Sequence, residues 1–410
     1  MPLNLDFELN NKGVSNAFDT IDLPRHRWYF YKEGFSPALV KKAIEENNLS
    51  KDDIVLDPFN GSGTVTLTAA TQGIKSIGFE VNPFTSFLSQ TKAANLSQNR
   101  FKKISEKVLS NCEKGSKSEL ENYSTFSENT HRGSEKWLFN KAVLRSYSGG
   151  YNNLTSKGSK SSRLVSLALI SAIMKNCNAK KDGKCLRYKN DWNELKYDKY
   201  SFLESLENEF KVIYKDLDKS VDMEPQIKTG DSRKLVKKLN ENFKLCITSP
   251  PYLNTFDYTD IYRPELFLGG FINSSEELRK LRFKTVRSHV QVSWEKSKLV
   301  DFGGHFNDVF KQISTKKDLL MHKNIPDMIT AYFEDMQNIL KDLKVKAAKD
   351  ASLWFVVSTS AYANEHIPVD LILADIATKV GWKLKEVGVL REIQKRRTKY
   401  SPDINKLRES

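Results

Sequence analysis

The chain has 410 residues, enough for a large buried core and for a catalytic domain that carries insertions. A formal net charge of +14 and an isoelectric point near 9.3 indicate a polyanionic partner, and charge alone leaves DNA, RNA and a membrane surface open. No apolar run approaches the roughly 20 residues of a membrane span, nothing resembles a signal peptide, and the cysteines lack metal-ligand spacing, so we expect a cytoplasmic protein with no membrane contact and no metal site.

An aromatic segment precedes the first predicted strand. His26 is followed by a dense group of aromatic side chains and by Phe35, Ser36 and Pro37, ahead of a helix predicted over 38–47. Aromatic residues at this density fill a core or line a cleft. The residues alone leave both interpretations open.

A strand, a glycine-rich turn and a helix come next. The apolar run 53–56 is short enough for a buried strand, and the turn over 57–64 leads into a helix that begins near Val65. Gly61 and Gly63 can take backbone angles closed to other residues and leave room for a ligand near the main chain. The start of the helix presents free N–H groups. By itself, such a turn can also be purely structural.

A second predicted strand ends in a carboxylate at a characteristic sequence separation from the glycine turn. The run 76–80 ends in Glu80, about twenty residues after the turn, and Asn82 lies in the turn that follows. A Rossmann-like unit binds ribose hydroxyls with an acid at this spacing. Together, the turn and the acid predict a nucleoside-containing cofactor.

Residues 100–225 are predicted to form a largely helical insertion. Periodicity is weak up to about residue 150, whereas 163–174 reads as a buried helix and 202–217 as an amphipathic one. Between them lies a basic stretch interleaved with aromatic residues. Its candidate DNA contacts are Lys180, Lys181, Lys184, Arg187 and Lys189. A solvated surface is the alternative interpretation of such a charge run.

A second motif follows the buried strand predicted over 243–247. The sequence Ser249-Pro250-Pro251-Tyr252 ends that strand, and its two prolines fix the backbone. A polar residue, a rigid corner and an aromatic ring therefore lie at the carboxyl end of a strand, where open α/β sheets bind ligands. A polyproline turn or a short recognition segment is the alternative. Upstream, Asp231 and Ser232 follow a possible strand over 226–228.

The last third of the chain alternates strands and helices. Helices are predicted over 326–343 and 369–380, a central strand over 352–357 and a late strand over 382–390. Two more basic regions supply the candidate DNA contacts Arg282, Arg287, Arg396 and Arg397. The alternation predicts an α/β fold, with a mostly parallel twisted sheet, helices on both faces and helical insertions.

The motifs together resemble those of the S-adenosylmethionine-dependent DNA amino-methyltransferases, which methylate exocyclic nitrogens. The resemblance covers most of the ends and centre of the chain, and it implies a Rossmann-like methyltransferase fold, S-adenosylmethionine as cofactor and double-stranded DNA as partner. The cofactor contacts that it implies are Phe35, Ser36, Pro37, Asp57, Pro58, Phe59, Gly61, Ser62, Gly63, Thr64, Glu80, Asn82, Asp231 and Ser232. The catalytic residues that it implies are Ser249, Pro250, Pro251 and Tyr252.

The same resemblance bears on the reaction. Methylation of cytosine carbon 5 needs a cysteine nucleophile, usually after a proline, and no cysteine here follows one. Family members with serine at the first position of the catalytic motif are mostly cytosine-N4 enzymes, so Ser249 favours cytosine N4 over adenine N6. An RNA or protein-nitrogen methyltransferase and a non-catalytic DNA-binding relative are further alternatives. A cognate restriction endonuclease encoded nearby is a candidate partner, with no physical complex implied.

The motifs divide the chain into five parts. Residues 1–99 are expected to form the N-terminal half of the cofactor-binding domain, and 226–268 to carry the adenine-contact and catalytic motifs. Residues 331–410 complete the sheet and add a basic tail. The insertions 100–225 and 269–330 are both candidate DNA-contact regions, and the position of the target-recognition region stays open between them.

Overall fold

A computed structural model gives the structure of residues 3–7, 14, 16–123, 125–127, 136–156, 158–182, 185–394 and 398–410. Its centre is a five-stranded sheet in the order β6-β3-β2-β7-β8, with every neighbouring pair parallel. The strands are β2 (Ile54–Asp57), β3 (Lys75–Glu80), β6 (Gln226–Thr229), β7 (Phe243–Thr248) and β8 (Ala347–Phe355). The parallel sheet confirms the predicted Rossmann-like α/β fold.

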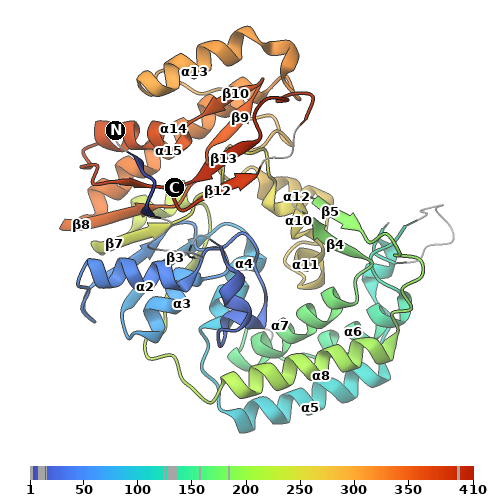
Figure 1. The fold of residues 1–410 in the computed structure, drawn as a ribbon. Coiled ribbons are helices and arrows are strands. Elements are labelled where there is room, and N and C mark those ends of the chain that lie inside the picture. Colours follow the sequence, from blue (N-terminus) through green and yellow to red (C-terminus); the bar gives the residue numbers. More distant parts are fainter. Residues whose placement is uncertain are drawn as a thin grey trace.

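Helices cover both faces of the sheet (Figure 1). These helices are α2 (Pro37–Glu46), α3 (Thr64–Thr71), α14 (Ile325–Lys346) and α15 (Val369–Lys379). Helix α13 (Gly304–Thr315) packs on α14 and α15. Val55 and Leu245 pack with α2 and α3, whereas Leu56 and Cys246 pack with α14 and α15. Adjacent strand residues point to opposite faces, so a strand buried on both faces must be apolar throughout.

The chain reverses its direction of travel across the sheet beside β2. It runs outward from β2 to β3 and β6, then returns to β7 and β8 on the other side. Ligands of open α/β sheets bind outside the carboxyl ends of the strands at such a switch point. Here, the Thr248 Oγ1 at the end of β7 donates a 2.6 Å hydrogen bond to Asp57 Oδ1 at the end of β2.

Four long helices form a second lobe beside the sheet (Figure 1). They are α5 (Gln98–Lys114), α6 (Lys141–Asn152), α7 (Lys160–Lys175) and α8 (Lys199–Asp216). The first two occupy the stretch whose periodicity is weak in the sequence. On α5 only a narrow stripe is buried, Phe101, Ser105, Val108 and Cys112, spaced by three or four residues. A stripe that narrow leaves most of the helix polar and dilutes the sequence signal.

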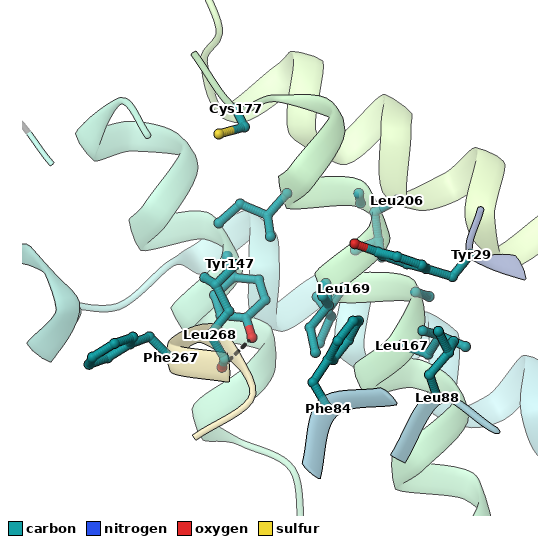
Figure 2. Packing of buried hydrophobic residues seen from close by; sticks show 14 of the residues in the cluster. Tyr29, Phe84, Leu88, Tyr147, Leu167, Leu169, Cys177, Leu206, Phe267 and Leu268 are labelled. Carbon is teal, nitrogen blue, oxygen red and sulfur yellow. Dashed lines mark hydrogen bonds between the residues drawn. The ribbon is translucent and has the colours of Figure 1, made fainter. Parts of the chain in front are cut away.

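The two lobes share one apolar core (Figure 2). It joins α7 to α4 (Pro83–Lys92) and to α11 (Arg263–Leu268). Phe84 of α4 is fully buried in it, and the Tyr147 hydroxyl donates a 2.7 Å hydrogen bond to the Leu268 carbonyl. The helical lobe is therefore fixed to the segment that follows the Ser249–Tyr252 corner.

Short elements complete the structure. They are β1 (Leu3–Asn4), β4 (Ala179–Asp182), β5 (Cys185–Tyr188), α9 (Ser232–Leu235), α10 (Tyr258–Ile261), α12 (Ser275–Arg282), β9 (Ser360–Tyr362), β10 (Glu365–Ile367), β11 (Val387–Gly388), β12 (Arg391–Gln394) and β13 (Lys406–Glu409), with short 3-10 turns between some of them. Among the described residues, no helix is both long and apolar enough to cross a membrane.

The late strand predicted over 382–390 is wrong. Trp382 is buried and its indole N–H donates to the Leu340 carbonyl at 3.1 Å, but residues 383–386 are exposed and only β11 is extended and paired there. The longer strand of this region is β12, which follows the predicted range and pairs antiparallel with β13. The apolar residues at the ends of 382–390 are therefore separate anchors and not one pleated face.

Candidate functional site

A cavity of about 350 Å³ opens at the carboxyl ends of β2, β3 and β7. It brings the glycine turn and Glu80 into one space with the Ser249–Tyr252 corner, which lies far from them in the sequence. The sequence-predicted residues in its wall are Phe35, Asp57, Phe59, Gly61, Ser62, Thr64, Glu80, Asn82, Asp231, Ser232, Ser249, Pro251 and Tyr252. Ser36, Pro37, Pro58, Gly63 and Pro250 lie behind this wall.

Asp57 is the buried acid at the base of the cavity. Its Oδ1 accepts hydrogen bonds from the Phe59 N–H at 3.0 Å and from the Thr248 hydroxyl at 2.6 Å. Burial raises the pKa of Asp57 to about 7, and these two hydrogen bonds oppose the shift. The carboxyl thus ties the glycine turn to the strand that carries the catalytic corner.

Glu80 organises the side of the cavity that is formed by the glycine turn. Its two carboxylate oxygens accept the backbone N–H groups of Gly61 at 2.7 Å and of Asn82 at 2.8 Å. Burial raises the pKa of Glu80, and these backbone hydrogen bonds oppose the shift. Gly61 has φ of +48°, which favours glycine where the turn meets the cavity wall, and a Cβ there would lie in contact with a ring carbon of Tyr31 at 3.4 Å.

Gly63 is required for a different reason from the one that its position in the turn suggests. It has φ of +85°, and a Cβ there would lie 2.6 Å from the Cβ of Ser89 on α4. This glycine allows close packing of the start of α3 against α4, and a cofactor contact at Gly63 stays a prediction.

Several candidate cofactor residues have structural partners. Ser36 caps α2, accepting the Ala38 N–H at 3.0 Å, and its hydroxyl also bonds Asp19. Ser232 donates to the Pro58 carbonyl. Asp231 caps α9 and is paired with the Arg233 guanidinium at 2.9 Å.

Two buried amide groups at the cavity have unused donors. The Nδ2 atoms of Asn60 and Asn82 make no hydrogen bond within the part of the chain that the structure describes. Both residues line the cavity. A buried donor without a partner costs about 1–3 kcal/mol, so these amides favour a ligand with acceptor oxygens.

The Ser249–Tyr252 corner, the candidate catalytic corner, is completed by residues from the far end of the sequence. The Ser249 hydroxyl donates to the Tyr252 hydroxyl at 3.4 Å, and Tyr252 donates to Glu409 Oε1 at 2.7 Å. The other oxygen of Glu409 accepts from Arg391 Nε at 2.7 Å. Burial raises the pKa of Tyr252 well above its ordinary value, with Glu409 as the next contribution. No local motif marks Glu409 or Arg391, and sequence reasoning missed both.

The candidate DNA contacts in the insertion differ in their exposure to solvent and in their intramolecular partners. Lys180 is exposed on β4, and Arg187 on β5 is exposed with an ion pair to Asp182 at 2.9 Å. Lys181 points inward, pairing with the buried Glu265 at 2.5 Å and lying 3.6 Å from the ring centroid of Tyr262. Lys189 donates to the Tyr197 hydroxyl at 2.9 Å.

The remaining candidates have intramolecular ion pairs or lie outside the described part of the chain. Arg282 pairs with Asp257 at 2.6 Å, and Arg287 pairs with Glu334 and Asp335, each at 2.7 Å. Both guanidinium groups are largely buried. The candidates outside the described residues are Lys184, Arg396 and Arg397. DNA contact stays a prediction for all nine, and Lys180 and Arg187 are the two of these with the most exposure.

Comparisons with known proteins find similarity to DNA methyltransferases. Residues 10–93 match the DNA methylase family N6_N4_Mtase. The chain is 27% identical to the type II methyltransferase M.BsoBI of Geobacillus stearothermophilus, over 90% of this chain and 80% of that protein. It is 26% identical to M.AvaI of Nostoc sp. strain PCC 7120, over 90% and 81% respectively, and 33% identical to M.MjaII of Methanocaldococcus jannaschii over 22% and 17%. No solved structure gives a significant match.

Proposed function

We propose, from the premise that the chain belongs to the DNA amino-methyltransferases, that it transfers a methyl group from S-adenosylmethionine to cytosine N4 in double-stranded DNA. Family membership supports site-specific methylation of DNA amino groups, and cytosine N4 is our finer assignment. One observation carries it: Ser249 occupies the first position of a Ser-Pro-Pro-Tyr corner that shares a cavity with Gly61 and Glu80.

The residues present fit S-adenosylmethionine, which supplies an electrophilic methyl group on a sulfonium. Each oxygen of the Glu80 carboxylate accepts one backbone N–H and retains capacity for a ribose hydroxyl. The unused Nδ2 atoms of Asn60 and Asn82 match the carboxylate or hydroxyl oxygens of the same molecule. The positive φ of Gly61 keeps the main chain open to it.

The catalytic corner suits an exocyclic amine. The amine lone pair is delocalised into the base, so acceptors must hold its two hydrogens and direct the nitrogen toward the methyl donor. We assign this role to Ser249 Oγ, which lines the cavity, and, as the motif implies, to the carbonyl of Pro250, whose residue lies behind the wall. A paired base cannot reach the cavity, so the target must leave the duplex, and we assign stacking on the flipped base to Tyr252.

The basic hairpin β4–β5 is our candidate for backbone contact. It lies beside α10, which begins six residues after Tyr252, and it presents Lys180 and Arg187 to solvent. Phosphate contact would give affinity without sequence preference. We further propose that the enzyme modifies DNA alongside a restriction endonuclease encoded nearby, as the type II designation of the relatives suggests.

Product analysis tests the base assignment. The chain is expressed in a host that lacks DNA methyltransferases, its DNA is digested to nucleosides, and the modified nucleoside is identified by mass spectrometry. We expect N4-methylcytosine, and much less of it when Ser249→Ala is expressed at the same level. Detection of N6-methyladenine would show that the target base is adenine and not cytosine. Modified RNA together with unmodified DNA would overturn the proposal.

A further inference from the structure

Three side chains form a hydrogen-bonded chain that leads away from the catalytic corner. Ser249 donates to Tyr252 and Tyr252 donates to Glu409, at 3.4 Å and 2.7 Å. All three residues line the cavity, and Glu409 is only 3% exposed. The first contact is long, as hydrogen bonds of catalytic groups often are before the substrate binds.

The direction of this chain is set by Glu409. An ionised carboxylate only accepts hydrogen bonds, so Tyr252 must donate its proton to Glu409. A lone pair of the Tyr252 oxygen then faces Ser249, and the serine proton is directed to it. The pKa of Tyr252 is raised by burial and by Glu409, which keeps the phenol protonated as the donor that this order requires.

The fold fixes Glu409 in place. It lies on β13 directly opposite Arg391 of β12, whose Nε donates to Glu409 Oε2 at 2.7 Å and balances its charge. A bridge between Ser358 and Glu409 ties the same strand to the chain just beyond β8. Two hydrogen bonds between Val357 and Ser410, each 2.8 Å, reinforce that attachment.

We propose that Glu409 is a positioning residue of the active site, which acts through Tyr252 to hold the Ser249 hydroxyl as a hydrogen-bond acceptor. This inference rests on the proposed function, because it concerns the amine that Ser249 receives. A serine hydroxyl can rotate, and a proton turned toward the amine would meet another donor. With the serine proton directed to Tyr252, the Ser249 lone pairs remain for an N–H of the target base.

Two conservative substitutions and their combination test the proposal. Tyr252→Phe keeps the ring for stacking and removes the hydroxyl link, whereas Glu409→Gln keeps the shape and removes the charge that sets the direction. In single-turnover assays with saturating DNA and S-adenosylmethionine, each is expected to lower the methylation rate constant about tenfold or more. The double variant should be no slower than Tyr252→Phe, because both changes interrupt the same chain.

Binding measurements separate positioning from a structural role. DNA affinity and S-adenosylmethionine affinity should stay within about twofold of wild type in both variants, since neither change removes a proposed binding contact. Glu392→Gln is the matched control: Glu392 lies on the same hairpin in an exposed ion pair with Lys406 at 2.9 Å, and its loss should leave the rate unchanged. If Glu409→Gln does not fold, the single-turnover rate and the two affinities of Tyr252→Phe test the hydrogen-bonded chain without it.

The outcomes distinguish this inference from the base assignment. A wild-type rate in Tyr252→Phe, or losses that multiply in the double variant, would overturn the positioning role. A rate loss matched by an equal loss of cofactor affinity would overturn it as well. The modified nucleoside in wild type reports separately on cytosine or adenine, and the ratio of variant to wild-type rates applies to either amine.

Discussion

The two halves of the cavity are built by contacts of very different range. In the cofactor half, Asp57 accepts the N–H of Phe59 two residues away, and Glu80 accepts that of Gly61 nineteen residues away. In the catalytic half, Tyr252 bonds Glu409, 157 residues further along the chain. The cofactor half is built mainly from neighbouring residues of the turn and Glu80, with Thr248 and Ser232 as its distant partners, and the catalytic half depends on strands at the opposite end of the described chain.

This difference predicts how each half responds to substitution. Changes at Gly61 and Gly63 should alter cofactor binding or local packing, because a Cβ at these positions meets Tyr31 and Ser89 and not the Ser249–Tyr252 corner. Changes in the corner should alter the rate of methyl transfer, because the glycine turn and Glu80 remain intact. The following experiments are ordered by the size of the expected effect.

Ser249→Ala should give the largest change. It removes the hydroxyl that we assign as acceptor for the target amine, and loss of one preorganised hydrogen-bonding group in an active site costs about 100-fold to 1,000-fold in rate. S-adenosylmethionine affinity, measured by calorimetry, should be unchanged. Equal loss of rate and of cofactor affinity would contradict the separation of the two halves.

Gly61→Ala and Gly63→Ala should differ in kind, although both residues have positive φ. The Gly63 variant places a Cβ 2.6 Å from Ser89, and overpacking of this type costs about 1–3 kcal/mol of unfolding free energy. The Gly61 variant should mainly weaken cofactor binding, because its Cβ faces Tyr31 at the cavity wall. Urea unfolding and calorimetry on both proteins make the comparison, and identical profiles would mean that the two glycines share one role.

Asp57 should give the cofactor half a stability that depends on pH. Its pKa in the folded protein is about 7, above the ordinary 3.8, so between these values the folded state binds more protons than the unfolded state. The contribution of Asp57 to the free energy of unfolding should therefore fall as pH rises from about 4 to about 7, by up to about 1.4 kcal/mol per pH unit. Above the folded pKa this contribution should be level.

Asp57→Asn should remove that slope. Both hydrogen bonds to Asp57 use Oδ1, and an amide oxygen can accept both. Denaturant unfolding of the cofactor-free protein at several pH values between 4 and 8 makes the measurement. Asp53→Asn is the control, because hydrogen bonds from Ser50 lower the pKa of that exposed carboxylate and its titration lies below this range. An unchanged slope in Asp57→Asn would assign the pH dependence to other groups.

Replacing Lys180 and Arg187 together by glutamine should give the smallest effect on chemistry. If both contact phosphate, binding weakens for every DNA sequence and the slope of log affinity against log salt falls by about 0.9 per lost contact. The single-turnover rate on saturating DNA should barely move. Lys102→Gln with Lys103→Gln, exposed on α5, removes the same charge elsewhere. Equal salt slopes in the two double variants would mean that Lys180 and Arg187 act only through their long-range electrostatic field and do not contact phosphate directly.

The sequence by itself determined the parallel sheet, the glycine turn with Glu80, and the Ser249–Tyr252 corner. Each of these depends on short-range features: apolar runs as long as a buried strand, glycines where φ is positive, and prolines that end β7. Helices α14 and α15 were likewise readable, because their buried residues recur with helical spacing.

Only the tertiary structure decided which distant side chains complete the site. Glu409 and Arg391 read as parts of a charged, polar tail, and their roles come from the pairing of β12 with β13 beside β8. Lys181 looked like a surface cation until Glu265 and Tyr262 were placed around it. Gly63 likewise needed the position of Ser89. Sequence periodicity reports the local environment of a residue, whereas a charge acquires its partner only when segments remote in the chain are packed together.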